Sequence, residues 1–259
     1  MTGRLAAIYR HPVKGFTPEP LTAADLVVGE GLAFDRLYAV ENGPSGFDPA
    51  APAHVPKQKF TVLASIPQVA LARTAYDGST ATLSARAPGR PDFNGRLDQD
   101  DGRRAFADWL EPLIAADVRG PLRVIEAPGD HRFMDHPLGD ISIINLASVR
   151  DIEARLGRSV DPLRFRANLY VDHWPAWAEL DWAGRTLALG PARAEVFKPI
   201  VRCAATHVDP TTGMRDIEMT KALFDLHGHM HCGLYVHVRR PGRITPGDAC
   251  DPVDTETRP

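Results

Sequence analysis

The sequence has few cysteines, no long apolar segment and no excess of positive charge. Three cysteines in 259 residues are too few for a disulfide-dense scaffold. The longest stretch without a charged residue, residues 60–72, is interrupted by polar residues and is too short to cross a bilayer. Lysine and arginine number 30 against 33 aspartates and glutamates, so we expect no nucleic-acid partner.

The composition that remains is that of an ordinary globular protein. Hydrophobic residues make up 44% and charged residues 24% of the chain, which suffices for one large domain or two modest ones. The first 15 residues contain no apolar run followed by a small-residue cleavage site. We therefore expect a cytoplasmic protein without a transmembrane segment, in which Cys203, Cys232 and Cys250 are reduced thiols.

Glycine and proline occur throughout the chain, with 21 and 23 residues, which favours short strands and turns over long helices. The sequence predicts a mainly β fold, with an N-terminal β-barrel-like region and a second β-barrel that carries a few peripheral helices. We place the boundary so that the regions span residues 1–119 and 120–259. The polar tail, residues 251–259, is expected to be frayed.

The apolar spacing locates individual elements. Helices are expected at residues 103–115, 145–156 and 220–226. Expected strands include residues 60–63, 69–72, 122–126, 204–208 and 233–238.

One cysteine has a distinctive environment in the sequence. Cys203 directly follows Arg202, and Lys198 lies five residues earlier. A neighbouring cation favours the thiolate, the form that attacks electrophiles and binds soft metals. The alternative, that Cys203 is a small buried residue of a strand, stays open on residue type alone. Cys232 and Cys250 have weaker environments, and we expect them to be structural.

Alternating histidines form a second group. His227, His229 and His231 precede Cys232, and histidine together with cysteine binds zinc or copper. Glycines interrupt a regular strand here, and no C-x-x-C or H-E-x-x-H spacing is present. A polar loop that faces a pocket is the favoured interpretation, and a zinc site is the alternative.

Basic residues lie beside expected turns at Lys14, Arg36, Arg166 and Arg202. Arginine offers a planar donor fork that suits phosphate, although any one such residue is usually a surface charge. Walker A, G-x-G-x-x-G and G-x-S-x-G motifs are absent, so these routes to nucleotide binding or hydrolysis have no support. The residues Asp-Pro-Thr-Thr-Gly at 209–213 predict a turn just beyond Cys203.

Several of these segments together resemble the MOSC family. The similar segments are L-x-x-I-Y-R-H-P-V-K-G at residues 5–15, G-E-G-L-A-F-D-R at 29–36, R-F-R-A-N at 164–168 and R-C-A-A-T-H-V-D-P-T-T-G at 202–213. The N-terminal segments resemble the family's β-barrel region. The combination resembles the two-part form typified by the amidoxime-reducing components.

The resemblance implies a molybdenum cofactor, a pyranopterin that holds the metal through its dithiolene and carries an anionic phosphate. By motif, Cys203 is implied as the protein ligand to molybdenum and as the catalytic residue. The positions that hold the cofactor by charge or hydrogen bonding are occupied by Lys14, Arg36, Ser148, Arg166, Asn168 and Arg202.

The chain departs from the family pattern at three positions. Gly15, Val201 and Ala167 stand where relatives often have serine, a small polar residue and proline. The first two departures remove side chains that could hydrogen-bond the cofactor. The sequence also lacks the C-x4-C-x2-C spacing of a plant-type ferredoxin domain. A reductase of this type would therefore take electrons from a separate ferredoxin- or flavoprotein-like donor.

The leading hypothesis is a molybdenum-cofactor-dependent oxidoreductase that reduces N-hydroxylated compounds, such as hydroxylamines and amidoximes. Cys203 would anchor the metal, and the cations would hold the cofactor. His207 and the loop at residues 227–231 are the candidate proton donors, because histidine titrates near neutral pH. Two further alternatives are a sulfur carrier or sulfurtransferase with a persulfide on Cys203, and a non-catalytic carrier of the cofactor.

Overall fold

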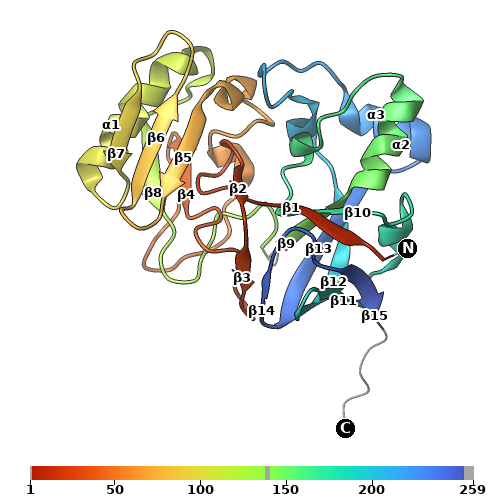
Figure 1. Ribbon diagram of the computed structural model, residues 1–259. Coiled ribbons are helices and arrows are strands. Elements are labelled where there is room, and N and C mark those ends of the chain that lie inside the picture. Colours follow the sequence, from red (N-terminus) through yellow and green to blue (C-terminus); the bar gives the residue numbers. More distant parts are fainter. Residues whose placement is uncertain (1, 138–140, 254–259) are drawn as a thin grey trace.

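The computed structural model describes residues 2–137 and 141–253, and it is mainly β (Figure 1). Over these residues it has fifteen strands and three α-helices, which confirms the predicted class. The strands are β1 (Arg4–Arg10), β2 (Glu19–Leu21), β3 (Ala24–Leu26), β4 (Tyr38–Asn42), β5 (Arg73–Asp77), β6 (Thr82–Arg86), β7 (Phe93–Arg96), β8 (Leu122–Glu126), β9 (Ile141–Asn145), β10 (Leu169–Asp172), β11 (Thr186–Leu189), β12 (Ala192–Val201), β13 (His231–Arg240), β14 (Gly242–Ile244) and β15 (Cys250–Val253). The helices are α1 (Asp100–Leu110), α2 (Leu146–Leu156) and α3 (Met219–His227). Within this part of the chain no helix has the length and apolarity to span a membrane.

An eight-stranded sheet, in the order β15-β11-β12-β13-β9-β10-β1-β2, forms the right-hand lobe in Figure 1. Its neighbours are antiparallel except for the parallel pair of β9 and β10. The sheet curls until its two sides meet. The Leu5 N–H donates to the Asp248 carbonyl and the Cys250 N–H to the Gly3 carbonyl, both at 2.9 Å. The inner face encloses a cluster of buried aliphatic side chains, so this lobe is a β-barrel-like body around one core.

Helices α2 and α3 pack side by side on the outside of this sheet. Val149 of α2 and Leu223 of α3 belong to one buried cluster with the strands beneath them. Asn145 begins α2 by accepting a hydrogen bond from the Ala147 N–H at 3.0 Å, and Gly157 ends it in the left-handed region at φ +65°. The end of this helix at Gly157 is the one that the sequence predicts.

The left-hand lobe in Figure 1 contains the three-stranded sheet β5-β6-β7, the pair β4-β8 and helix α1. Phe106 and Leu110 of α1 are fully buried in a core with Tyr38 and Leu83. These two residues lie one turn apart on the same face of α1, and this apolar face covers the core of the lobe.

Strands cross the predicted boundary at residues 119/120 in both directions. Near the N-terminus, β1 pairs with β10 and β3 pairs with β14. After the boundary, β8 returns to pair with β4. The two lobes are therefore interlocked through their sheets, and the boundary itself stays a prediction.

Some local expectations are wrong. Residues 60–63 form no strand, and residues 69–72 and 204–208 lie largely in the 3-10 helices Pro67–Leu71 and Ala204–His207. A proline at the first position favours the former helix, because its φ is already helical. In the tail, residues 251–253 are not frayed but pair with β11, and the remaining tail residues lie outside the described part of the chain.

Candidate functional site

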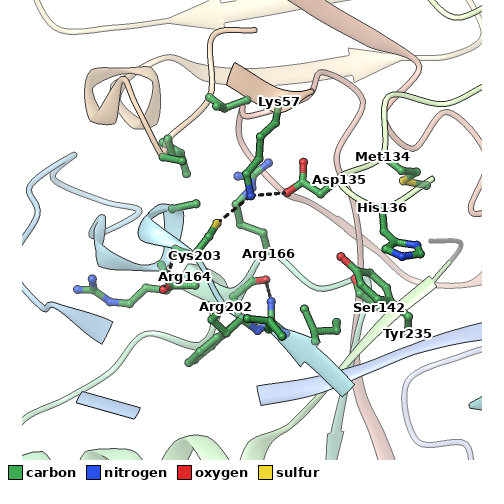
Figure 2. Close-up of a pocket in the computed structure, with 18 of the residues that line it drawn as sticks. Lys57, Met134, Asp135, His136, Ser142, Arg164, Arg166, Arg202, Cys203 and Tyr235 are labelled. Carbon is green, nitrogen blue, oxygen red and sulfur yellow. Dashed lines mark hydrogen bonds and ion pairs between the residues drawn. The ribbon is translucent and has the colours of Figure 1, made fainter. Parts of the chain in front are cut away.

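A cavity of about 430 Å³ opens where the two lobes meet, and residues of both line it (Figure 2). The structure brings together six of the seven residues that the sequence nominates: Lys14, Arg36, Arg166, Asn168, Arg202 and Cys203. Seven cationic side chains and, among the described lining residues, a single carboxylate border the cavity. Such an excess of positive charge favours an anionic ligand.

Ser148 is the residue that the structure does not bring to the cavity. It lies fully buried on α2, where its hydroxyl donates to Glu179 Oε1 and accepts from the Trp177 N–H, both at 2.9 Å. These contacts tie α2 to the segment after β10. The expectation that Ser148 hydrogen-bonds the cofactor has no support in this placement, because this face of α2 packs on residues 177–179.

Lys14 is held at the cavity wall by a carbonyl and a carboxylate. Its Nζ donates to the Phe133 carbonyl at 2.8 Å and lies 2.5 Å from Asp135 Oδ1. Burial lowers the pKa of Lys14, although Asp135 opposes the shift. Burial alone would raise the pKa of Asp135, but Lys14 and Lys57 hold it well below its usual value. Asp135 is therefore ionised and partly offsets the local positive charge.

Asp35 positions two of the expected cofactor-binding residues. This fully buried carboxylate is hydrogen-bonded to the Arg36 guanidinium and accepts from Asn168 Nδ2 at 3.0 Å. Asn168 Nδ2 also donates to the Tyr9 carbonyl, and its Oδ1 accepts from the Ser142 hydroxyl at 2.9 Å. Asn168 thus shapes the cavity wall, while its amide is largely engaged within the protein.

Arg166 carries a charge that the protein does not neutralise by direct contact. It follows the 3-10 helix Pro162–Phe165 in the left-handed region at φ +52°, and its Nη1 donates to the Phe16 carbonyl at 2.8 Å. Within the described part of the chain it forms no ion pair. Burial, followed by the nearby Arg36, lowers the pKa of Arg166 to about 10. An anion in the cavity would relieve this cost.

Arg202 is fixed by backbone carbonyls at the end of β12. Its Nε donates to the Cys232 carbonyl at 2.7 Å and its Nη1 to the Phe165 carbonyl at 2.9 Å. Gly233, at φ +79°, leaves room for this arrangement, because a Cβ there would lie 3.0 Å from Arg202 Nη2 and 2.3 Å from the Ile143 carbonyl oxygen. The guanidinium is therefore held rigidly next to Cys203.

Cys203 meets a lysine that the sequence analysis missed. Lys57, in the segment that follows β4, donates from its Nζ to Sγ of Cys203, which follows β12, at 3.1 Å (Figure 2). Burial alone would lower the pKa of Lys57, but Asp135 and Cys203 raise it above its usual value. The Cys203 sulfur therefore lies in direct contact with a positively charged group. By contrast, the buried Cys232 has its pKa raised to about 12, as a structural thiol would.

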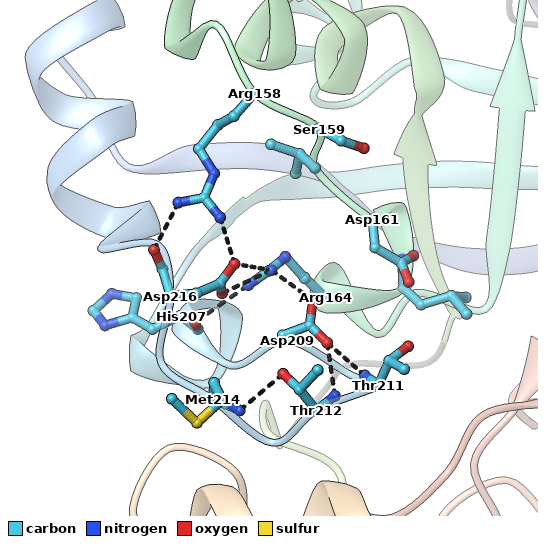
Figure 3. A network of polar contacts seen from close by, with 12 residues as sticks. Arg158, Ser159, Asp161, Arg164, His207, Asp209, Thr211, Thr212, Met214 and Asp216 are labelled. Carbon is cyan, nitrogen blue, oxygen red and sulfur yellow. Dashed lines mark hydrogen bonds and ion pairs between the residues drawn. The ribbon is translucent and has the colours of Figure 1, made fainter.

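Arg164 also lines the cavity, and two aspartates neutralise its positive charge (Figure 3). Its Nη2 lies 2.8 Å from Asp216 and 3.1 Å from Asp209. Asp209 also accepts from the N–H groups of Thr211 and Thr212, each at 2.8 Å. The turn predicted at residues 209–213 is thus confirmed, and it fixes the carboxylate that holds Arg164.

Two of the three departures from the family pattern, Gly15 and Ala167, have local explanations. At Gly15, φ is +90° and a Cβ would lie 2.5 Å from the Thr61 carbonyl oxygen, so glycine fits where a side chain would not. The Ala167 N–H donates to Tyr170 Oη at 3.2 Å, a bond that proline could not make. Val201 lines the cavity and is 58% exposed.

The histidines divide into those at the cavity and those away from it. Of the group at residues 227–231, His231 lines the cavity, whereas His207 Nε2 lies 2.9 Å from Thr220 Oγ1 and is not among the lining residues. The described residues contain no cluster of three or more histidine, cysteine, aspartate or glutamate side chains that could hold a metal ion. The zinc alternative therefore has no support in the described geometry.

Several other residues that line the cavity come from separate segments without a motif, so the sequence alone does not predict them. They include Lys57, Asp135, His136, Ser142, Arg164 and Tyr235. Lys198, noted only for its place before Cys203, also lines the cavity.

Family comparisons agree with the segments that the sequence analysis singled out. The MOSC N-terminal beta barrel domain matches residues 2–117, and the MOSC domain matches residues 130–251. The chain is 23% identical to mitochondrial amidoxime-reducing component 1 of Homo sapiens, over 95% of this chain and 82% of that protein. It is 30% identical to molybdenum cofactor sulfurase of Drosophila willistoni over 54% of this chain, but spans only 18% of the sulfurase.

Among solved structures, the YuaD protein from Bacillus subtilis is similar at a TM-score of 0.42 and 15% identity, over 96% of this chain and 94% of that one. The two family models together span most of the chain. The chain therefore belongs to the MOSC family and carries both its N-terminal beta barrel domain and its MOSC domain.

Proposed function

We propose that this cavity binds a molybdenum cofactor and that the chain reduces N-hydroxylated compounds with electrons from a separate donor protein. The observation that carries the proposal is the meeting of Cys203 with a set of cations in one cavity between the lobes. The names of two relatives, an amidoxime-reducing component and a molybdenum cofactor sulfurase, point the same way.

The residues present fit such a cofactor. Its phosphate is anionic, and Arg166 is a half-buried cation without a carboxylate in contact in the described part of the chain. A cysteine thiolate is a soft ligand that suits a sulfur-bound transition metal, and Cys203 borders the cavity with Lys57 against its sulfur. Lys14, Arg36 and Arg202 supply further charge for the phosphate.

Each group has a distinct role in the proposed reaction. Cys203 would anchor the metal, and the Lys57 ammonium lies against its sulfur. When bound, the cofactor supplies the two-electron redox chemistry that breaks the N–O bond. In balance, R–NHOH with two electrons and two protons gives R–NH₂ and water. Of the histidines expected from the sequence as proton donors, His231 borders the cavity and is placed to deliver protons there.

Elemental analysis tests the proposal first. Protein from molybdate-fed cells that make the cofactor should hold close to one molybdenum per chain, and Cys203→Ala should lose it or hold it weakly. Cys250→Ala, which removes a buried thiol outside the cavity, is the matched control. The loaded protein is then given a chemical reductant and a panel of hydroxylamines and amidoximes. Full molybdenum content without turnover of any of them would overturn the reductase proposal and leave a cofactor carrier.

The contact between Lys57 and Cys203 also favours a second candidate, a persulfide carrier. An ammonium group 3.1 Å from the sulfur would stabilise a persulfide anion as it does a thiolate. This candidate predicts cyanide-labile sulfane sulfur on Cys203 in protein free of molybdenum. Absence of that sulfur in freshly prepared, unreduced protein would eliminate it.

A further inference from the structure

Lys198 has no role in the arrangement described so far. Of the seven cations at the cavity, four match family positions for the cofactor. Two carboxylates neutralise Arg164, and Lys57 is hydrogen-bonded to the Cys203 sulfur. Lys198 remains, and within the described residues it forms no ion pair. Its Nζ lies 2.8 Å from His136 Nε2. A cation that borders a cavity without a carboxylate partner is available to a ligand.

An irregularity in β12 directs Lys198 toward the cavity. The pairing of β12 with β13 shifts between Val196 and Lys198, so that Val196 stands opposite Val236 and Lys198 opposite Tyr235. A bulge of this kind changes the face on which the following side chain lies. As a result, Lys198 and Tyr235 both line the cavity.

Flat rings flank this lysine. The His136 ring lies 5.8 Å from the Tyr235 ring at an interplanar angle of 34°, and 5.4 Å from the Phe197 ring. Lys198 Nζ lies 5.3 Å from the centre of the Phe197 ring. In Figure 2, His136 and Tyr235 lie together on one side of the cavity, apart from Cys203.

The hydrogen bond between Lys198 and His136 has a defined donor and acceptor. Burial, followed by the neighbouring Lys198, keeps the pKa of His136 below its usual value. The imidazole is therefore neutral at pH 7, and its Nε2 accepts a hydrogen bond from the ammonium of Lys198. His136 acts as a positioning residue that leaves the other ammonium hydrogens of Lys198 for a ligand.

We infer that Lys198, His136 and Tyr235 form an anion subsite that selects N-hydroxylated substrates with a carboxylate on a planar body. The inference rests on the proposed function, because the reacting group would lie at the Cys203 end of the same cavity. Lys198 lies five positions before Cys203 in the sequence, so their Cα atoms are at most about 17 Å apart. A single small molecule can reach both ends. The ammonium would bind the carboxylate, and the rings would contact the planar body.

A matched pair of probes tests the inference. The first is 4-carboxybenzamidoxime, and the second is its neutral analogue 4-carbamoylbenzamidoxime. Wild-type protein should show the lower KM for the carboxylate. Lys198→Met should raise the KM for the carboxylate about tenfold or more and change that for the amide less than twofold. Lys198→Arg should retain most of the preference. Lys221→Met, which removes an exposed lysine on α3, is the control.

His136→Ala tests the positioning role. It should weaken the preference for the carboxylate through KM while kcat for the neutral probe stays unchanged, whereas a defect in folding would affect both probes. The inference is overturned if both probes turn over and Lys198→Met leaves the ratio of their KM values unaltered. If neither probe turns over in molybdenum-loaded protein, the reductase proposal fails separately. Calorimetric binding of the carboxylate probe to wild type and Lys198→Met then decides the subsite, and equal affinity would refute it.

Discussion

Replacing Arg166 with methionine should stabilise the protein that lacks the cofactor and weaken its hold on the cofactor. The reason is that the guanidinium is a half-buried positive charge that forms no ion pair within the described residues, and an anionic ligand would supply its missing partner. The backbone at this position has φ +52°. Arginine and methionine carry the same Cβ, so the substitution leaves this strain unaltered and changes the charge.

The expected size follows from the pKa. A decrease from 12.5 to about 10 corresponds to roughly 3 kcal/mol, at about 1.4 kcal/mol per pKa unit, and water in the cavity reduces this figure. Because the folded-state pKa is the lower one, the cost is fully present at every pH below about 10. Loss of the hydrogen bond to the Phe16 carbonyl opposes the gain by about 1 kcal/mol. A net gain of about 1 kcal/mol should raise Tm by roughly 2–4 °C.

Two measurements decide the matter. Thermal unfolding is compared between wild type and Arg166→Met purified from cells that cannot make the cofactor. Molybdenum content is compared for both proteins from cells that can, and the affinity should fall about tenfold or more. Arg104→Met, at an exposed position on α1, should change neither quantity. A variant that unfolds at a lower temperature and keeps its molybdenum would refute the reasoning, because Arg166 would then serve the fold.

Three further predictions concern the thiol and the network beneath α2. Lys57→Met should slow iodoacetamide alkylation of Cys203 at pH 7 by about tenfold, because the sulfur loses the positive charge in contact with it, whereas Lys59→Met should not; equal rates would refute the role of Lys57. Ser148→Ala should lower the free energy of unfolding in urea by about 1–3 kcal/mol without changing molybdenum content, and a loss of metal at unchanged stability would restore its predicted cofactor role. Burial raises the folded-state pKa of Glu179 above 4.5, so stability should fall as pH rises from 4.5 through that pKa. Urea titrations of Glu179→Gln should lack this component, and an unaltered pH dependence would contradict it.

The local patterns in the sequence were sufficient for the class of fold and for some elements. Residues 122–126 form a strand with the expected bounds, and α2 ends at Gly157, because an apolar pattern and a stop signal lie within one short segment. The curling of the large sheet could not be predicted, because the bond from the Leu5 N–H to the Asp248 carbonyl joins opposite ends of the chain. No local pattern encodes such a pairing.

The residues of the candidate site were likewise predicted from the sequence only in part. The motif residues do converge on one cavity, since each motif lies at the end of a strand or at a turn that faces the junction of the lobes. Ser148 was misplaced because the face of a helix that meets a cavity depends on what packs against it, here Glu179, 31 residues later. Lys57 and His136 were missed because single side chains from irregular segments leave no periodic or motif signal.

The closure of the large sheet has a consequence for biosynthesis. Residues 3–5 are synthesised well before some of their hydrogen-bonding partners, residues 247–250. At a synthesis rate of about 5–20 residues per second, β1 waits tens of seconds for these hydrogen-bonding partners. During this interval its apolar face is a target for chaperones or for strands of other nascent chains. Slowing translation between residues 5 and 247 should therefore lower the yield of folded protein.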